Sequence, residues 1–225
     1  ILENRNQFEL YHHYLQTPES IKTIKADELN ISVVVINELK KTGQALSDVL
    51  TEEVYVGLIN NLIEEIKSLL YSNYFNRGNL YTVLDKFDMA EADYNLALEF
   101  VADDVNVQYS LGYIYLKKGN YKKAVEKFET CLSKGLKEYS TCMNLATAYS
   151  KLGYTSKALE AYEQAITLKP DGYDAYYNKI WILYEAGDFN AALKEINNIM
   201  NRFSAERELY SLRASCNYQL GDYQS

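Results

Sequence analysis

Residues 105–138 read VNVQYSLGYIYLKKGNYKKAVEKFETCLSKGLKE, and residues 139–172 read YSTCMNLATAYSKLGYTSKALEAYEQAITLKPDG. The two stretches have equal length, and small and aromatic residues recur in them at matching places, so that Tyr115 in the first corresponds to Tyr149 in the second. The interval from Tyr115 to Tyr149 is therefore the period of this part of the chain, and we call it the repeat step. The columns that share it are Gly78, Gly112 and Ala146; Tyr81, Tyr115 and Tyr149; Ala90, Ala124, Ala158 and Ala192; Tyr94, Phe128 and Tyr162; and Gly119, Gly153, Gly187 and Gly221.

The columns divide residues 71–225 into repeated units, each of which predicts two helices joined by a turn. The glycine column marks that turn, because glycine readily takes the left-handed conformation that ends a helix. Small residues let two helices approach closely, large aromatic residues fill the space beside them, and neighbouring units must stack to bury their faces. The sequence therefore predicts an all-α array. Its units are 71–104, 105–138, 139–172, 173–206 and a partial unit, 207–225.

The order of small and aromatic residues within one unit carries a family resemblance. Gly112-x-x-Tyr115 precedes Gly119-Asn120-Tyr121 and then Ala124-x-x-x-Phe128, and the following unit ends in Pro170. This order resembles the tetratricopeptide repeat (TPR) family, and the resemblance covers about two-thirds of the chain. It implies a right-handed α-solenoid, the TPR superhelix, made of stacked antiparallel helix pairs.

The fourth unit departs from the pattern at two buried-type positions. Ile180 occupies the column of small residues, and Leu183 occupies the column of tyrosines. We therefore expect the packing around this unit to be looser or differently angled.

Residues 1–70 do not continue the columns but keep a helical pattern. We expect a degenerate helix pair over 27–50 and 52–70 that caps the array, and a further helix over 1–16. An alternative interpretation of residues 20–43 is a helix-turn-helix that binds DNA. Its recognition face would offer mainly Val33, Val34 and Asn37, which are poor readers of base edges, so simple helix packing explains the segment equally well.

The composition limits the classes of partner. The chain has 23 basic and 31 acidic residues and a net charge of −8, which argues against nucleic acid and against anionic membranes. No apolar run is long enough for a membrane span. The three cysteines, Cys131, Cys142 and Cys216, suit a reducing compartment, so we expect a cytoplasmic protein. Because the sequence starts at Ile1 without a leader, we also expect a trimmed fragment.

The sequence offers no catalytic constellation. His12 and His13 are adjacent, so on a helix they point about 100° apart and cannot easily share a metal. Cys131 and Cys142 occupy columns of small or core residues, where we expect inert buried thiols. Phosphate-binding and dinucleotide-binding glycine motifs are missing. We therefore expect no enzyme activity, no cofactor and no metal site.

The resemblance implies that the first helix of each unit lines a concave groove that holds a peptide. Asn76, Asn144 and Asn178 share one first-helix position, similar to the asparagine ladder in the array of O-linked N-acetylglucosamine transferase. An amide side chain offers one acceptor and two donors, so it can pair with a peptide unit whatever that unit's side chain. These asparagines predict contacts to the backbone of a bound segment.

Aromatic residues occupy neighbouring first-helix positions. Tyrosine and tryptophan combine apolar area with a polar tip and are enriched at binding hot spots. We expect the partner to be a protein or peptide segment that is uncharged or basic. The predicted peptide-binding residues are Asn76, Asn79, Tyr109, Tyr113, Asn144, Tyr177, Asn178, Trp181 and Tyr184.

Three statements about partners and context complete the sequence-based expectations. The positions at which chaperone-binding members of the family clamp a carboxylate with lysine and arginine carry no cations here, so we expect no binding of a heat-shock chaperone tail. One alternative is that the chain is the N-terminal targeting or regulatory array of a larger enzyme or of a helix-turn-helix transcriptional regulator. Another is self-association through the partial repeat that ends at Ser225.

Overall fold

The computed structural model describes residues 52–203 and 206–222, and every regular element in these residues is an α-helix. The expected all-α architecture is therefore confirmed for the part of the chain that is described. The chain divides into two compact units, Ile1–Asn73 and Tyr74–Ser225. Helix α3, Glu52–Val83, begins in the first unit and ends in the second.

Helix α3 contains the helix expected over 52–70 and continues without a break past residue 71. The proposed boundary between residues 70 and 71 therefore falls inside a helix. The other N-terminal predictions, namely the helices over 1–16 and 27–50, the alternative over 20–43 and the pair His12 and His13, lie outside the described residues.

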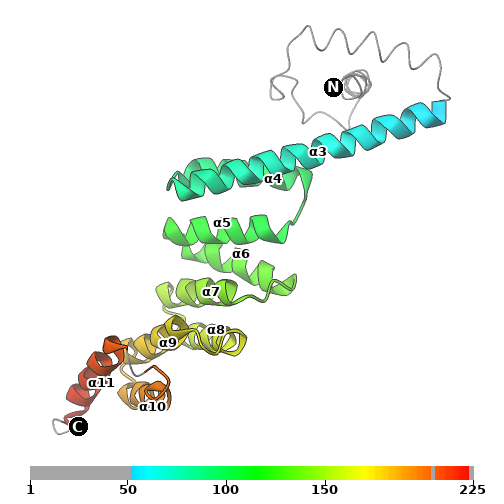
Figure 1. The fold of residues 1–225 in the computed structure, drawn as a ribbon. Coiled ribbons are helices and arrows are strands. Elements are labelled where there is room, and N and C mark those ends of the chain that lie inside the picture. The colour runs from blue at the N-terminus through cyan, green and yellow to red at the C-terminus, as the bar shows by residue number, and fades with distance from the viewer. Residues whose placement is uncertain (1–51, 204–205, 223–225) are drawn as a thin grey trace. The chain divides into compact units, whose positions relative to one another are not determined.

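The second unit is a stack of helix pairs (Figure 1). Each helix from α4 to α11 contacts the next, and the first helices of neighbouring repeats also meet, α5 with α7 and α9 with α11. The starts of α5, α7, α9 and α11 are separated by the repeat step. The bounds are α4 Phe87–Phe100, α5 Val105–Lys117, α6 Tyr121–Ser133, α7 Tyr139–Lys151, α8 Thr155–Leu168, α9 Tyr173–Glu185, α10 Phe189–Ile199 and α11 Arg207–Leu220.

The turns inside the repeats require a left-handed residue. Gly119, Gly153 and Gly187 have φ angles of 75°, 75° and 79°, at the end of the first helix of each pair. In the first repeat the same position holds Asp85, with a φ of 55°. Aspartate tolerates this conformation better than most residues with a Cβ, so the turn is kept without glycine.

The column of small residues on the first helix faces the column of aromatic residues on the second. A Cβ added to Gly78 would lie 2.7 Å from a ring carbon of Tyr94, and one added to Gly112 would lie 2.8 Å from a ring carbon of Phe128. Real Cβ atoms do not approach other heavy atoms so closely. The rings occupy the space that a larger residue would need, which explains why the two columns recur together.

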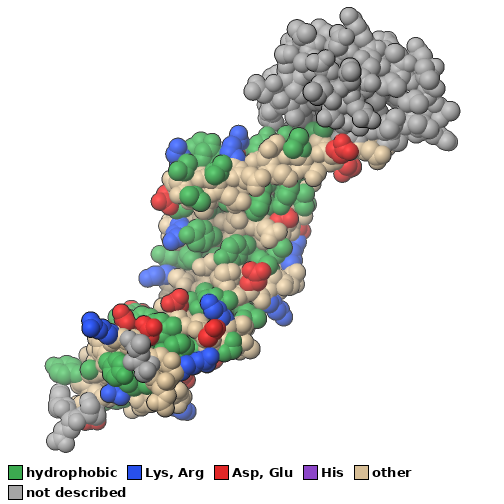
Figure 2. All heavy atoms as spheres, viewed as in Figure 1, with side chains coloured by type: hydrophobic (Ala, Val, Ile, Leu, Met, Phe, Trp, Pro, Cys, Tyr) green, Lys and Arg blue, Asp and Glu red, His purple; other side chains and the backbone are tan. Residues whose placement is uncertain are grey.

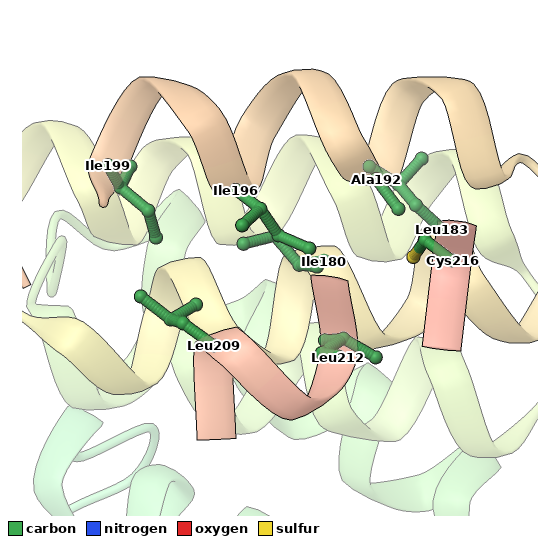
Figure 3. Packing of buried hydrophobic residues seen from close by; sticks show 8 residues of the cluster. All are labelled: Ile180, Leu183, Ala192, Ile196, Ile199, Leu209, Leu212 and Cys216. Atoms are coloured by element: carbon green, nitrogen blue, oxygen red, sulfur yellow. The ribbon is translucent and has the colours of Figure 1, made fainter. Parts of the chain in front are cut away.

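The fourth repeat satisfies the same contact with different residues. Ile180 stands in the column of small residues, and Ile196 stands in the column of aromatic residues; both are fully buried in one cluster (Figure 3). A larger residue on one helix is thus matched by a smaller one on its partner. Even so, α9 and α10 approach each other less closely than α5 and α6 or α7 and α8 do, which agrees with the looser packing that we expected around this repeat.

The residues just before the small column and just before the aromatic column form an ion pair, and its members differ between repeats. In the first repeat Arg77 donates to both carboxylate oxygens of Asp93 at 2.7 Å, and Asp93 is buried. The corresponding pair in the fourth repeat is Lys179 and Glu195, 3.1 Å apart. Glu163 from the preceding helix pair also binds Lys179. A buried charge is tolerated only when it is paired, and here ion pairs tie a first helix to the second helices packed against it.

Candidate functional site

A hollow of about 180 Å³ lies between the first helices α9 and α11. It brings together three of the predicted residues, Tyr177, Trp181 and Tyr184, all from α9. The facing residues of α11 are Glu208, Ser211, Leu212 and Ser215. We call this feature the α9–α11 hollow.

The α9 wall of the hollow is a continuous row of aromatic rings. Tyr177 and Trp181 stack, with centroids 6.3 Å apart and planes 24° apart, and Trp181 and Tyr184 follow at 5.9 Å. Tyr173 extends the row at one end and Phe189 extends it at the other. Side chains three and four residues apart share one face of a helix, which is why the rings line up. Mutual contact holds the rings in place while leaving Trp181 41% exposed.

The α11 wall leaves room because its residues are small. Ser211 follows Tyr177 by one repeat step, and Ser215 follows Trp181 by the same interval, so serines occupy the positions at which the preceding repeat carries large rings. Leu212 is buried between them. The hollow therefore results from the contrast between two neighbouring repeats, with aromatic residues on one and serines on the other.

The hollow carries negative charge at one end. Glu208 lines it and is exposed. The pKa of the nearby Tyr173 hydroxyl is raised to about 12, first by burial and then by the charges of Glu208 and Glu206. This hydroxyl is buried and has no hydrogen-bond partner among the residues that the structure describes. The carboxylates of Glu206 and Glu208 thus place negative charge near the start of the aromatic row.

A second set of predicted residues meets between α5 and α7. The Nδ2 of Asn144 donates a hydrogen bond of 3.1 Å to the hydroxyl of Tyr109, whose ring packs edge-on against Phe128 at 5.8 Å. Both Asn144 and Tyr109 are half-buried. Asn144 therefore links two first helices, and it keeps its side-chain oxygen as an acceptor.

The remaining predicted residues lie apart from these two groups. Asn76 is exposed on α3, and Asn178 is half-buried on α9. Asn79 accepts a hydrogen bond of 2.8 Å from the hydroxyl of Tyr94, so its oxygen supports the core of the first pair. Tyr113 is half-buried, and the ammonium of Lys117 lies over its ring at 5.3 Å. The structure thus forms two local groups and does not gather all the predicted residues in one pocket.

Sequence reasoning missed the α11 side of the hollow. Glu208, Ser211 and Ser215 were not among the predicted residues. The signal was available, because one repeat step forward from Tyr177 and from Trp181 leads to the two serines. A search for aromatic residues alone could not find a cavity that small residues create.

Another hollow, of about 500 Å³, lies among α6, α7 and α8 and includes Cys142. All three cysteines are buried and unpaired. Burial raises the pKa of the Cys131 thiol to about 11 and also raises the pKa of Cys142 and Cys216. Thiols protonated at neutral pH are poor nucleophiles and poor metal ligands, so this hollow has no evident chemistry.

The described surface gives no further sign of a metal centre or a membrane segment. Within residues 52–203 and 206–222, no group of three histidine, cysteine or acidic side chains could hold a metal ion. No helix in the same residues has the length and apolarity needed to cross a bilayer. Figure 2 shows lysine and arginine interspersed with acidic side chains over the described part of the face in view.

Comparison with protein families identifies the repeated unit. Models described as tetratricopeptide repeats match residues 71–100, 105–134 and 151–216. A TPR repeat-containing protein of Methanocaldococcus jannaschii is 31% identical over 139 residues, which cover 58% of this chain and 22% of that protein. The BBSome complex member BBS4 of Bos taurus is 30% identical over 118 residues, which cover 52% of this chain and 22% of that protein. The chain thus spans about a fifth of the length of these curated relatives.

Solved structures agree on the fold. YrrB, described as a TPR protein with an unusual peptide-binding site, superposes with a TM-score of 0.59 at 22% identity, over 67% of this chain and 78% of that chain. MamA superposes with a TM-score of 0.63 at 19% identity, over 68% of this chain and 84% of that chain. At these identities the likeness shows a common arrangement of helices.

Proposed function

Because this chain belongs to the tetratricopeptide repeat family, we propose that it holds a segment of a partner protein against its first helices. The family supports the role of a protein-interaction scaffold. The finer proposal is that an uncharged or basic peptide segment lies along α5, α7, α9 and α11. The chain binds the segment without catalysing a reaction on it.

The α9–α11 hollow is the observation that carries the proposal. Its aromatic row is held in place before any ligand arrives, and Trp181 remains 41% exposed. A tryptophan that a partner covers contributes a large apolar area, and rigid aromatic residues lose little entropy on binding. A partner side chain that enters the hollow would anchor the segment at this point.

The asparagines supply the complementary contacts to the backbone. Asn178 lies on α9 next to Tyr177 in the sequence. Asn144 uses its Nδ2 in the hydrogen bond to Tyr109, and this bond does not involve its side-chain oxygen, which can accept. Amides along successive first helices can bind peptide units at intervals, independently of the segment's sequence. The aromatic row would then provide selectivity, and the amides would provide affinity common to all ligands.

Selection from a random peptide library tests the proposal. Peptides that bind the chain are isolated, labelled with a fluorophore and titrated by anisotropy. Replacing Trp181 with alanine should weaken binding at least tenfold, which is about 1.4 kcal/mol and within the range of hot-spot residues. Asn178→Ala should weaken all selected peptides to a similar degree, because its contact is to the backbone.

The matched control is Tyr154→Ala. Tyr154 is 50% exposed and precedes the second helix α8, away from the predicted groove. This variant should bind the peptides within about twofold of the parent chain. Circular dichroism confirms that each variant stays helical. If no peptide is selected, or if Trp181→Ala and Tyr154→Ala bind alike, the proposed function is wrong.

A further inference from the structure

We infer that the α9–α11 hollow receives an arginine side chain of the bound segment. This inference rests on the proposed function and names the residue that the hollow selects. Three features support it, namely the size of the hollow, the rings that line it and the single charge that it contains.

The size of the hollow fits a side chain. Pockets for small-molecule ligands usually enclose about 300–1,000 Å³. The α9–α11 hollow, at about 180 Å³, falls below that range and lies between two helices that the segment would have to cross. A single long side chain projecting from a peptide is the occupant that suits this volume.

The rings of the hollow lack the cation that other rings in the chain possess. The ammonium of Lys123 lies 4.9 Å from the ring centroid of Tyr115, and that of Lys157 lies 5.2 Å from the ring centroid of Tyr149. Among the described residues, no lysine or arginine lies over Tyr177, Trp181 or Tyr184. Tryptophan is the best acceptor of such a contact, so the hollow leaves an unused site for a cation.

Glu208 is the only charged residue among the described ones that line the hollow. A cation that enters the hollow would therefore meet one carboxylate and no lining cation that repels it. A guanidinium suits this geometry better than an ammonium, because it is planar, stacks on rings and can donate two parallel hydrogen bonds to one carboxylate. Aromatic stacking and charge complementarity thus favour arginine.

The chain provides its own reporter for the test, because Trp181 is its only tryptophan. The full chain is titrated with N-acetyl-arginine amide and, separately, with N-acetyl-citrulline amide, which has nearly the same shape without the charge. We expect a saturable change in tryptophan emission at millimolar concentration, with a dissociation constant about fivefold lower for the arginine amide. Equal constants for the two amides, or no saturable change with the arginine amide, would overturn the inference.

The variant Glu208→Gln tests the role of the charge. It should remove most of the preference for arginine over citrulline, whereas Glu99→Gln, which removes an exposed carboxylate from α4, should keep it. A preference that survives Glu208→Gln unchanged contradicts the proposed arrangement.

The outcomes separate this inference from the proposed function. If selected peptides depend on Trp181 but the two amides bind equally, the inference fails and the proposed function stands. If the arginine amide is preferred but no peptide is selected, the proposed function fails while the preference of the hollow is upheld.

Discussion

The exchange of large and small residues between neighbouring helices leads to a quantitative prediction. The second repeat packs Gly112 against Phe128, whereas the fourth packs Ile180 against Ile196 at the corresponding positions. We expect the isoleucine pair to work in the second repeat only when both residues are changed. Gly112→Ile and Phe128→Ile should each destabilise the chain, and the double variant should recover most of the loss.

The magnitudes follow from the contact distances. A Cβ at position 112 would lie 2.8 Å and 3.0 Å from two ring carbons of Phe128, against an optimal separation of about 3.5–4.0 Å. The ring is fully buried and has no room to withdraw, so Gly112→Ile should cost about 3 kcal/mol, the upper part of the range for overpacking. Phe128→Ile leaves a partial cavity beside glycine and should cost about 1–2 kcal/mol. The double variant should cost about 1 kcal/mol.

Urea denaturation followed by circular dichroism measures the four free energies of unfolding. The predicted coupling between the two substitutions is about 3–4 kcal/mol in the favourable direction, far above the roughly 0.5 kcal/mol seen for independent sites. The reverse pair, Ile180→Gly with Ile196→Phe, should show coupling of the same sign. Additive effects in the second repeat would refute the idea that these two columns define each other's size.

Three further predictions concern the helix stack itself. Burial raises the pKa of Glu91, but hydrogen bonds from Lys118 at 2.7 Å and Tyr115 at 2.8 Å outweigh it and leave the pKa below its ordinary value. The stability that the ionised Glu91 contributes is present at neutral pH and is lost as the pH falls through the folded-state pKa. Glu91→Gln should therefore flatten the decline in melting temperature between about pH 5 and pH 3. The three buried thiols should not react with dithionitrobenzoate at pH 8 in the native chain, and all three should react in urea; fast labelling of the native chain would contradict the assigned burial. Asp85→Gly should stabilise the chain by about 0.5–1 kcal/mol, because Asp85 has a φ of 55°, a left-handed conformation that glycine adopts at less cost. An unchanged unfolding midpoint in urea would show that Asp85 is not strained.

The helix pairs were accessible from the sequence because their determinants are periodic. Each glycine turn and each small or aromatic column repeats at a fixed step, so a single register predicts every pair from α5 to α10. The pairing of Ile180 with Ile196 could also have been predicted, because one stands in the column of small residues and the other in the column of aromatic residues. It was missed because the two positions were not considered as one contact.

The candidate site was only partly accessible. The aromatic residues of α9 were found because a surplus of tyrosine in first-helix positions, together with the single tryptophan, is visible in the sequence. Their arrangement as a row that faces serines of α11 depends on how α9 packs against the next repeat. The same is true of Asn144, which the sequence places in a ladder and the structure joins to Tyr109.

Sequence alone determined that this chain forms stacked helix pairs, because turn residues and alternating small and large positions act locally and recur at a constant interval. Only the tertiary structure decided where the surface is open. Whether an aromatic residue of one helix fills the space beside it or borders a hollow depends on the side chain that the neighbouring repeat presents. At Trp181 that neighbour is Ser215, which is too small to cover the ring.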